Sequence, residues 1–209
     1  MQKSAQTHIR ILKAAAEVFA TAGVTGATTR EIARVAGVNE VTLFRHFQSK
    51  EQLLGAVVGH VIALQAEALT HQEEWTQDLY RDLTHYAQIY NNMLEEYEAL
   101  IRTFIGEAKR HPEAARRVIQ EAAQPLRDKL ITYLRGGMER GTVRCDLDPL
   151  PAVDMFTGML LAGMLRHTAA PIPRGYSREC YIETCVDLFV RGISTAPIHT
   201  THSLPINDG

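Results

Sequence analysis

Apolar side chains recur at helical spacing along most of the chain. The pattern opens with Ile9, Leu12, Ala16, Phe19 and Ala20, and clusters of turn residues interrupt it further on. It predicts about nine helices: one that ends at Gly23, and others over 28–36, 39–47, 50–69, 75–97, 98–110, 112–136, 149–167 and 177–193. No segment alternates between apolar and polar residues over a convincing length. The chain is therefore predicted to be all-α.

A short break in AGVNE (36–40) separates the second and third predicted helices. Gly37 can adopt a positive φ that ends one helix, and Asn39 can cap the next. Val38 and Leu43 can then bury between the two helices, while Phe47 can close toward the first helix of the chain. Two short helices joined by such a turn form a helix-turn-helix, although an ordinary helical hairpin would show the same spacing.

The composition is that of a soluble globular protein. Apolar residues make up 45% of the chain and charged residues 22%, which is enough to form a core. The two longest apolar stretches, 53–66 and 155–165, are shorter than the ~18 residues that cross a bilayer, and no signal peptide is recognisable. The three cysteines lack metal-binding or redox spacing. We therefore expect a cytoplasmic protein without a membrane span, a metal site or a cofactor.

Basic residues concentrate near the N-terminus. Residues 1–55 contain seven Lys and Arg side chains but four Asp and Glu side chains, whereas the net charge of the whole chain is −2. The rest of the chain is therefore acidic. A basic N-terminal segment followed by an acidic remainder indicates that only this segment contacts a polyanion. It argues against a protein that binds nucleic acid along its whole length.

Residues 28–54, TTREIARVAGVNEVTLFRHFQSKEQLL, resemble the DNA-binding domain of TetR-family transcriptional regulators. The family pattern runs T-x-x-x-I-A-x-x-A-G-V, then a short helix that ends in aromatic-x-H-F, then x-S-K-E-x-L. The positions that match it are Thr28 or Thr29, Ile32, Ala33, Ala36, Gly37, Val38, Leu43, Phe44, His46, Phe47, Ser49, Lys50, Glu51 and Leu53. The chain beyond this stretch resembles the family only loosely.

The resemblance implies a two-domain organisation and three partners. Residues 1–50 would form the helix-turn-helix DNA-binding domain, and a long helix would join it to an effector-binding and dimerisation domain over 51–195. The partners would be a double-stranded DNA operator, a small-molecule effector of unknown identity and a second copy of the chain. The tail 196–209 has little to bury and is expected to be disordered.

The homodimer would form through the last two long helices, 149–167 and 177–193. Their apolar faces suit a four-helix bundle between subunits, and Gly158, Ala162 and Gly163 would allow the helices to approach closely. The same faces could instead belong to the core of a single subunit.

In a helix-turn-helix the second helix enters the major groove, and its first residues meet base edges. By resemblance Val41 and Thr42 would contact bases, while Arg30 and Arg45 would contact bases or phosphates. Glu40 would either accept a hydrogen bond from a cytosine or exclude other sequences. The predicted DNA-binding set is Thr28, Thr29, Arg30, Asn39, Glu40, Val41, Thr42, Phe44, Arg45, His46 and Lys50.

Contacts to the phosphate backbone are expected from Thr28, Thr29, His46 and Lys50. Family members usually carry tyrosine at the position of Phe44, and its hydroxyl touches a phosphate. Phe44 lacks that hydroxyl and cannot donate this bond, so it is expected to have a packing role.

Aromatic and methionine side chains of the middle helices are candidates for the walls of an effector pocket, because they form adaptable apolar surfaces. The candidates are Tyr86, Tyr90, Met93, Phe104, Phe156 and Met159, with Arg102 as a polar anchor for an acidic ligand. Apolar residues at this spacing also form ordinary cores, and Arg102 could equally have a surface role.

The function predicted from these features is that of a homodimeric repressor, which a small-molecule effector releases from a pseudo-palindromic operator. An activator would show the same sequence features. No catalytic motif is recognisable, so an enzyme is not expected. The alternative is a helical adaptor that binds protein through the turn.

Overall fold

The computed structural model describes residues 2–68, 75–110, 112–169 and 175–195. These residues form ten α-helices and one π-helical stretch, with no strand beyond a single bridge between Val143 and Ser194. The prediction of an all-α fold is confirmed. The tail 196–209, which the sequence predicts to be disordered, lies outside the described residues.

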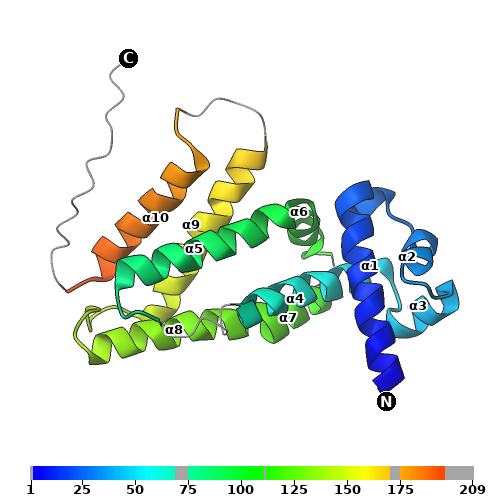
Figure 1. Cartoon of the computed structure of the whole chain (residues 1–209), viewed down its shortest axis with the longest axis horizontal. Coiled ribbons are helices and arrows are strands. Elements are labelled where there is room, and N and C mark those ends of the chain that lie inside the picture. The colour runs from blue at the N-terminus through cyan, green and yellow to red at the C-terminus, as the bar shows by residue number, and fades with distance from the viewer. Residues whose placement is uncertain (1, 69–74, 111, 170–174, 196–209) are drawn as a thin grey trace.

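Three helices form an N-terminal unit at one end of the molecule (Figure 1): α1 (Gln2–Gly26), α2 (Thr29–Val35) and α3 (Glu40–His46). Ile11, Ala15 and Phe19 of α1 are fully buried and form the centre of this unit's core. Gly23 has a φ of 68°, as predicted for a helix end, but helical hydrogen bonding resumes beyond the kink and continues to Gly26.

Six further helices form the body: α5 (Leu79–Glu96), α6 (Glu98–Glu107), α7 (Pro112–Val118), α8 (Gln124–Glu139), α9 (Pro149–Ala169) and α10 (Arg178–Ile193). Helix α5 packs against α9 and α10, and α9 also packs against α8 and α10. Phe156 of α9 is fully buried in this bundle, and its ring stacks on that of Phe189 with centroids 4.5 Å apart. Apolar contacts of this kind supply most of the driving force for folding.

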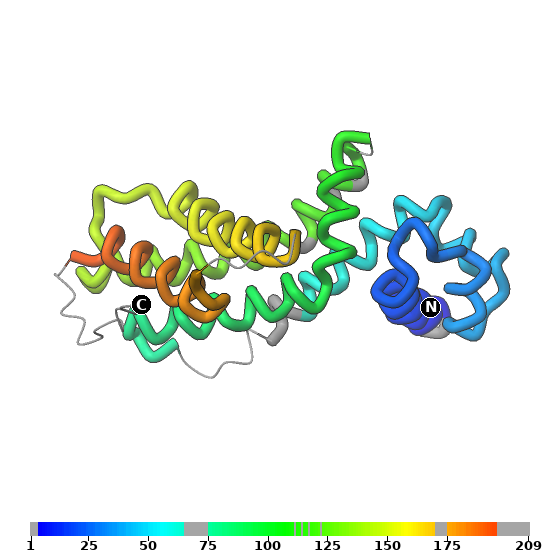
Figure 2. The backbone as a smooth tube through the Cα atoms, turned by 90° about the horizontal axis from the view of Figure 1, so that it is seen from above, coloured from blue at the N-terminus to red at the C-terminus, as the bar shows by residue number. Residues whose placement is uncertain are grey.

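The long helix α4 (Lys50–Ala68) leads from the N-terminal unit into the body (Figure 2). At its start the Ser49 hydroxyl accepts a hydrogen bond from the Gln52 amide at 3.2 Å, and the Gln52 side chain accepts one from the Gln48 amide at 3.3 Å. These reciprocal bonds satisfy amides that a helix start otherwise leaves free. Because α4 packs against α1 as well as α6, α7 and α8, it connects the two parts mechanically.

The sequence pattern predicts one helix over 112–136, but the structure divides this segment. A π-helical stretch, Ile119–Ala123, separates α7 from α8, and the Gln124 amide donates to the Ile119 carbonyl five residues back. Pro125 explains the division, because proline has no amide hydrogen and its ring would clash with the carbonyl four residues earlier in a regular α-helix. The division accounts for the tenth helix.

The prediction that a helix begins at Trp75 is also wrong, because α5 begins at Leu79. The buried Asp82 carboxylate turns back and accepts a hydrogen bond from the Thr76 amide at 3.0 Å. It also accepts one from the Tyr133 hydroxyl of α8 at 2.7 Å. These bonds satisfy the backbone before α5 without a helical turn, so the segment takes a bent conformation instead.

Candidate DNA-binding surface and ligand cavity

The turn between α2 and α3 is held by α1. Gly37 has a φ of 63°, which confirms the predicted positive value and which residues with a Cβ rarely adopt. The Arg10 guanidinium donates hydrogen bonds to the carbonyls of Ala36 at 2.5 Å and of Gly37 at 3.1 Å. A Cβ at Gly37 would lie 2.8 Å from Nη2 of Arg10. Arg10 therefore belongs to the site, although the sequence analysis did not single it out.

Both short helices begin at capping residues, of which Asn39 is predicted from the sequence. The Thr28 hydroxyl accepts a hydrogen bond from the Glu31 amide at 3.1 Å. The Asn39 side chain accepts one from the Thr42 amide at 2.7 Å. Each cap satisfies a free amide of the first turn, so α2 and α3 begin at defined positions.

Helix α3 has a buried edge and an exposed face. Leu43 and Phe47 are buried in the core of the N-terminal unit, whereas Val41 is 70% exposed and Phe44 is 44% exposed. Arg45 is exposed beside them. Phe44 is therefore only partly packed against the protein, and its contact with DNA stays a prediction. Exposed apolar groups on such a helix suit contact with thymine methyl groups in the major groove.

Glu40 has a partner inside the protein. The Thr29 hydroxyl of α2 donates a hydrogen bond to the Glu40 carboxylate of α3 at 2.5 Å. The bond joins the first turns of the two helices. The two roles predicted for Glu40, a hydrogen bond to a cytosine and the exclusion of other sequences, do not include this contact. Thr29 was predicted to contact a phosphate of the DNA.

The other predicted phosphate contacts lie in different settings. The Lys50 ammonium donates a hydrogen bond to the Ala27 carbonyl at 2.6 Å, which ties α4 to the segment before α2. The His46 ring lies 5.6 Å from the His8 ring of α1. Arg30 of α2 is exposed. The contacts of these residues with DNA stay predictions.

A cavity of about 480 Å³ lies where the N-terminal unit meets the body. It is lined by His8 of α1, His46 of α3 and His60 of α4, together with Glu113 of α7 and Glu121 of the π-helical stretch. Burial and the neighbouring histidines lower the pKa of His8, and burial and a nearby lysine lower the pKa of His60. His8 and His60 therefore favour the neutral form.

The histidine, cysteine and carboxylate side chains form no metal-binding cluster within the part of the chain that the structure describes. Of the helices in the same part, none combines the length and the apolar character needed to cross a membrane. Burial raises the pKa of the Cys185 thiol, while Cys145 is exposed.

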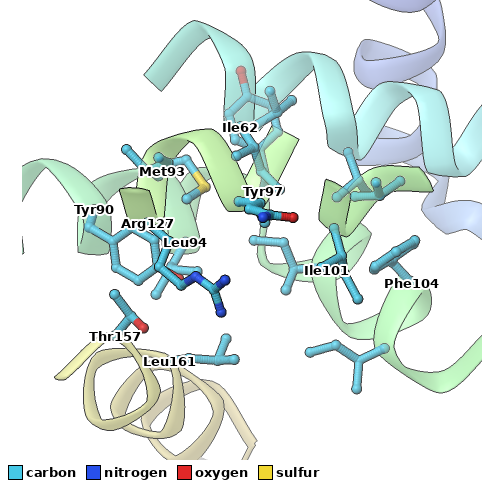
Figure 3. Close-up of a pocket in the computed structure, with 18 of the residues that line it drawn as sticks. Ile62, Tyr90, Met93, Leu94, Tyr97, Ile101, Phe104, Arg127, Thr157 and Leu161 are labelled. Carbon is cyan, nitrogen blue, oxygen red and sulfur yellow. The ribbon is translucent and has the colours of Figure 1, made fainter. Parts of the chain in front are cut away.

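A second cavity, of about 310 Å³, lies within the body between α4, α5, α6, α8 and α9 (Figure 3). Most of its wall is aliphatic or aromatic. Four of the predicted effector contacts line it: Tyr86, Tyr90, Met93 and Phe104. A mainly apolar cavity of this size suits a small organic molecule, and the binding role of these residues stays a prediction.

Two tyrosines of α5 line this cavity, Tyr86 and Tyr90. The rings of Tyr86 and Tyr90 stack with centroids 5.8 Å apart. Burial raises the pKa of Tyr90 to about 12, and burial followed by the effect of Tyr90 also raises the pKa of Tyr86. Both groups therefore stay protonated and can donate. The Tyr86 hydroxyl is buried and has no hydrogen-bond partner among the described residues.

Two predicted effector contacts do not line the cavity. Phe156 is in the core of the body, where its ring stacks on Phe189. Met159 lies toward α10, and its carbonyl accepts a hydrogen bond from the Tyr181 hydroxyl at 2.9 Å. Both are packing residues, which is the alternative that their helical spacing left open.

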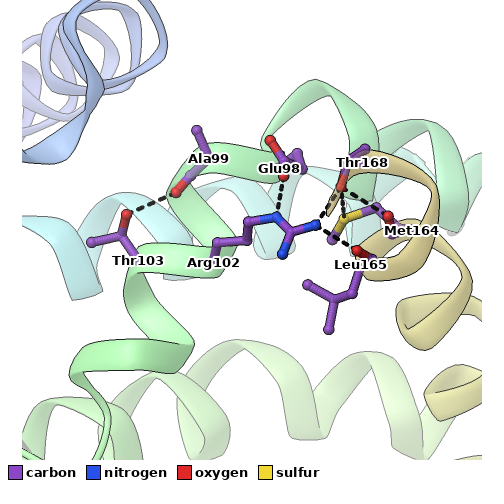
Figure 4. A network of polar contacts seen from close by, with 7 residues as sticks. All are labelled: Glu98, Ala99, Arg102, Thr103, Met164, Leu165 and Thr168. Atoms are coloured by element: carbon purple, nitrogen blue, oxygen red, sulfur yellow. Dashed lines mark hydrogen bonds and ion pairs between the residues drawn. The ribbon is translucent and has the colours of Figure 1, made fainter. Parts of the chain in front are cut away.

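Arg102 is not a polar anchor of the cavity either. Its guanidinium joins α6 to α9, since Nη2 donates to the Leu165 carbonyl at 2.6 Å and to the Thr168 hydroxyl at 2.5 Å. It also forms an ion pair with Glu98 on its own helix (Figure 4). These contacts hold Arg102 away from the ligand cavity.

The polar groups of the cavity are residues that the sequence analysis missed: Arg127 of α8 and both Asp154 and Thr157 of α9. Nη1 of Arg127 lies 3.4 Å from each carboxylate oxygen of Asp154. Nε of Arg127 is buried and has no hydrogen-bond partner in the described structure. Arg127 lies one helical turn before the buried Leu130 and Ile131. A charged residue on the apolar stripe of a helix is the sequence signal that could have found it.

The outer faces of α9 and α10 carry exposed apolar side chains. Met155 of α9 is 68% exposed and Leu188 of α10 is 60% exposed. A Cβ at Gly158 would meet no atom within 4 Å, whereas one at Gly163 would lie 2.2 Å from the Tyr181 ring of α10. Gly163 therefore serves close packing inside one subunit, and Met155, Gly158 and Leu188 remain candidates for contact between subunits.

Known proteins match both parts of the chain. Residues 11–57 match the family model for bacterial regulatory proteins of the tetR family, and residues 74–181 match that for the tetracyclin repressor-like C-terminal domain. The chain is 30% identical over 190 residues to the HTH-type transcriptional regulator YvkB of Bacillus subtilis, covering 90% of this chain and 97% of YvkB.

Solved structures share the fold. A protein of Saccharomonospora viridis in complex with choline has a TM-score of 0.74 at 17% identity, over 92% of this chain and 100% of that one. The regulator FadR of Bacillus subtilis in complex with stearoyl-CoA has a TM-score of 0.66 at 20% identity, over 88% and 98%. Identities this low show the fold alone. The two family models and the similarity to YvkB show more, namely that this chain belongs to the TetR family of bacterial transcriptional regulators.

Proposed function

We propose that the chain is a repressor that binds a pseudo-palindromic operator as a homodimer and leaves it when a small molecule fills the body cavity. The observation that carries the proposal is the exposed face of α3. Val41, Phe44 and Arg45 are open to solvent, while Leu43 and Phe47 anchor the helix in the core behind them. A short helix held in this way can enter the major groove without changing the rest of the unit.

Residues 1–50 act in this proposal as the DNA-binding domain, and residues 51–195 as the effector-binding and dimerisation domain. Val41 and Thr42 contact bases, and Arg30 and Arg45 contact bases or phosphates. Thr28, His46 and Lys50 contribute to the phosphate contacts, in addition to the internal hydrogen bonds of Thr28 and Lys50. Such a protein acts in the cytoplasm, where the operator is.

The proposed dimer forms through the outer faces of α9 and α10, around Met155, Gly158 and Leu188. Two helices from each subunit then make a four-helix bundle, which covers apolar side chains that the single subunit exposes. The dimer presents two copies of α3 to one face of DNA. Their separation must match one helical turn, ~34–36 Å, or a multiple of it.

Helix α4 supplies the proposed link between ligand and DNA. It begins at Lys50 beside the DNA-binding unit, and its residues Val58, Val61 and Ile62 lie on the cavity wall. A ligand that binds better when α4 is displaced would favour a dimer whose two α3 helices no longer match B-DNA. The effector thereby lowers the population of the DNA-bound form.

The test is binding of the purified protein to DNA from upstream of its own and neighbouring genes, against scrambled DNA, over a salt series. We expect a specific complex with two subunits per site. The logarithm of its binding constant should fall with the logarithm of the salt concentration, with a slope of about −0.9 per phosphate contact. Loss of operator binding in the Thr42→Ala variant would support the proposal that α3 contacts the bases. A protein-binding adaptor is the better explanation if two results are found together. The wild type would bind these DNAs no more tightly than scrambled DNA, and substitutions in α3 would not change that binding. Recovery of an effector unchanged after incubation would show binding without turnover.

A further inference from the structure

We propose that the body cavity binds an apolar molecule carrying one carboxylate, and that Arg127 is the group that recognises the carboxylate. The inference rests on the proposed role of this cavity as the effector site. It goes further, because it names the chemical class of the ligand and the residue that selects it. The chemistry of the wall supports this class through three separate features.

The first feature is the unused edge of the Arg127 guanidinium. Arg127 contacts Asp154 through Nη1 alone, at 3.4 Å from each oxygen, which is longer than the ~2.7–2.9 Å of a good charge-assisted hydrogen bond. Nε is buried and unpartnered within the described residues. In Figure 3 the guanidinium lies among Tyr90, Thr157 and Leu161. A second carboxylate can therefore bind Arg127 in the two-pronged geometry that a planar guanidinium favours.

The second feature is the position of Asp154. Its side chain is 54% exposed, so this carboxylate can turn toward water when a ligand carboxylate replaces it at Arg127. An exposed ion pair of this length contributes little free energy. The ligand therefore competes with a weak internal contact, and the positive charge of Arg127 stays compensated.

The third feature is Tyr86, a residue of the cavity wall whose buried hydroxyl is a second donor without a partner among the described residues. Buried donors are normally hydrogen-bonded, because an unpaired one costs free energy. Two unpaired donors in one mainly apolar cavity call for a ligand with acceptor oxygens. A cationic ligand would bring its charge to the same space as Arg127 and would leave both donors unsatisfied.

The remaining wall selects an apolar body for this ligand. The apolar part of the wall includes Ile62 of α4, Leu94 of α5, Ile101 and Phe104 of α6, and Leu161 of α9 (Figure 3). Burial of each methylene is worth about a fourfold gain in affinity at the usual transfer free energy. The affinity of straight-chain carboxylates should therefore rise with chain length until the cavity is full.

The experiment measures binding to the full-length protein in the absence of DNA by isothermal titration calorimetry. The probes are octanoate, 1-octanol and octyltrimethylammonium, which share a chain and differ in the head group. Carboxylates from hexanoate to dodecanoate and 2-naphthoate then distinguish aliphatic from aromatic acids. We expect octanoate to bind more tightly than both other head groups, and affinity to rise about fourfold per methylene.

Variants assign the head-group contact. Arg127→Met should weaken octanoate binding by about 10- to 100-fold and leave 1-octanol binding unchanged. Asp154→Asn should strengthen octanoate binding by about two- to fivefold, because it removes the competing charge. Arg135→Met is the matched control, since Arg135 is an exposed arginine on the same helix, and it should change neither affinity.

The proposal is overturned if 1-octanol or octyltrimethylammonium binds as tightly as octanoate, if Arg127→Met binds octanoate as well as the wild type does, or if no acid of the series binds. Because no DNA is present, these results do not depend on the operator. If octanoate binds through Arg127 but does not release the operator, the proposed release by effector fails while the ligand class stands.

Discussion

The Thr29 hydroxyl of α2 and the Glu40 carboxylate of α3 are joined by a hydrogen bond of 2.5 Å. Each of these helices has seven residues, so a bond between their first turns restrains the angle at which α3 is presented. The Glu40 carboxylate lies on a surface proposed to face phosphates, where a negative charge is unfavourable. Its bond to Thr29 gives this carboxylate a structural role between α2 and α3.

We expect Thr29→Val and Glu40→Ala to show a coupling free energy of about 1 kcal/mol in a double-mutant cycle of unfolding, because the bond is partly buried. Urea unfolding of the four proteins measures it. The exposed pair Glu31 and Arg34 is the control and should couple by no more than ~0.5 kcal/mol. Equal coupling in the two pairs would show that the Thr29 bond has no special role.

Replacement of Gly37 by alanine should destabilise the protein by about 1–2 kcal/mol, because the φ of 63° is unfavourable for a residue with a Cβ. The new Cβ would also lie 2.8 Å from Nη2 of Arg10, so the hydrogen bonds of Arg10 to the turn should weaken and operator affinity should fall. Chemical denaturation and DNA titration measure the two effects.

Gly106→Ala is the control for this change. A Cβ at Gly106 would meet no atom within 4 Å, and the residue lies inside α6. Alanine should therefore stabilise the protein by up to ~1 kcal/mol through helix propensity. A stabilising effect of Gly37→Ala would contradict the assigned role of the turn.

Changes at Val41 and Phe44 should separate DNA binding from stability. Because Val41 is 70% exposed and Phe44 is 44% exposed, Val41→Ala and Phe44→Ala should change the free energy of unfolding by less than ~0.5 kcal/mol. Each should nevertheless lower operator affinity by about 1–3 kcal/mol if it contacts a base. Equal loss of stability and affinity would instead mean that α3 unfolds.

Phe44→Tyr restores the hydroxyl that family members usually carry at this position, so it should raise DNA affinity where Phe44→Ala lowers it. The added group should gain one phosphate contact, worth about 1 kcal/mol of DNA affinity, at an exposed position where it does not disturb the core. Operator titration measures the gain, and Ile9→Tyr, at an exposed position on α1, should leave affinity unchanged. No gain in Phe44→Tyr would place this side chain away from the backbone of DNA.

The histidines between the N-terminal unit and the body predict a pH dependence of stability. The pKa values of His8 and His60 are lowered from the ordinary value of 6.5, so the folded protein binds fewer protons than the unfolded chain. Their contribution is fully present above pH 6.5 and is lost as the pH falls from there toward the folded pKa values. Thermal unfolding between about pH 5 and pH 8 should show a falling Tm below neutrality.

His8→Phe and His60→Phe should flatten this dependence, because a phenyl ring can occupy the half-buried position of each histidine without titrating. His85→Gln is the control, since His85 is exposed on α5, and it should keep the wild-type profile. If the two phenylalanine variants keep the wild-type slope, carboxylates and not these histidines determine it.

Glutamate at Met155 or Leu188 should weaken the dimer, because it places charge on the apolar outer faces of α9 and α10. Both positions are more than half exposed in the single subunit, so the fold should survive. Sedimentation velocity and circular dichroism measure the two properties. Ile9→Glu, an exposed position on α1, should remain dimeric, and a monomeric wild-type protein would refute the proposed interface.

The turn of the DNA-binding unit could be predicted from the sequence because its signals are local. The positive φ of Gly37 and the cap at Asn39 are properties of residues close together along the chain, and the structure confirms them. The contacts of Arg10 with this turn could not be predicted in this way, because Arg10 is remote in sequence. The start of α5 was predicted wrongly because the Asp82 carboxylate binds the amides of Thr76 and Gln77 and replaces a helical turn there. The conformation of this carboxylate depends in part on a remote partner. Asp82 is bound by Tyr133 across the body, and no local pattern contains that contact.

Helical periodicity and capping are properties of neighbouring residues, so the all-α fold and the position of the turn could be predicted from local patterns. The family could be predicted from the resemblance of residues 28–54 to a known motif. Packing between distant segments, in contrast, determines which arginine lines the body cavity. Arg102 and Arg127 both lie on amphipathic helices, but packing turns Arg102 toward α9, where it binds Leu165 and Thr168. The same packing places Arg127 on the cavity wall and leaves its Nε buried, with no hydrogen-bond partner among the described residues. Which face of a helix meets which neighbour depends on contacts between segments distant in sequence.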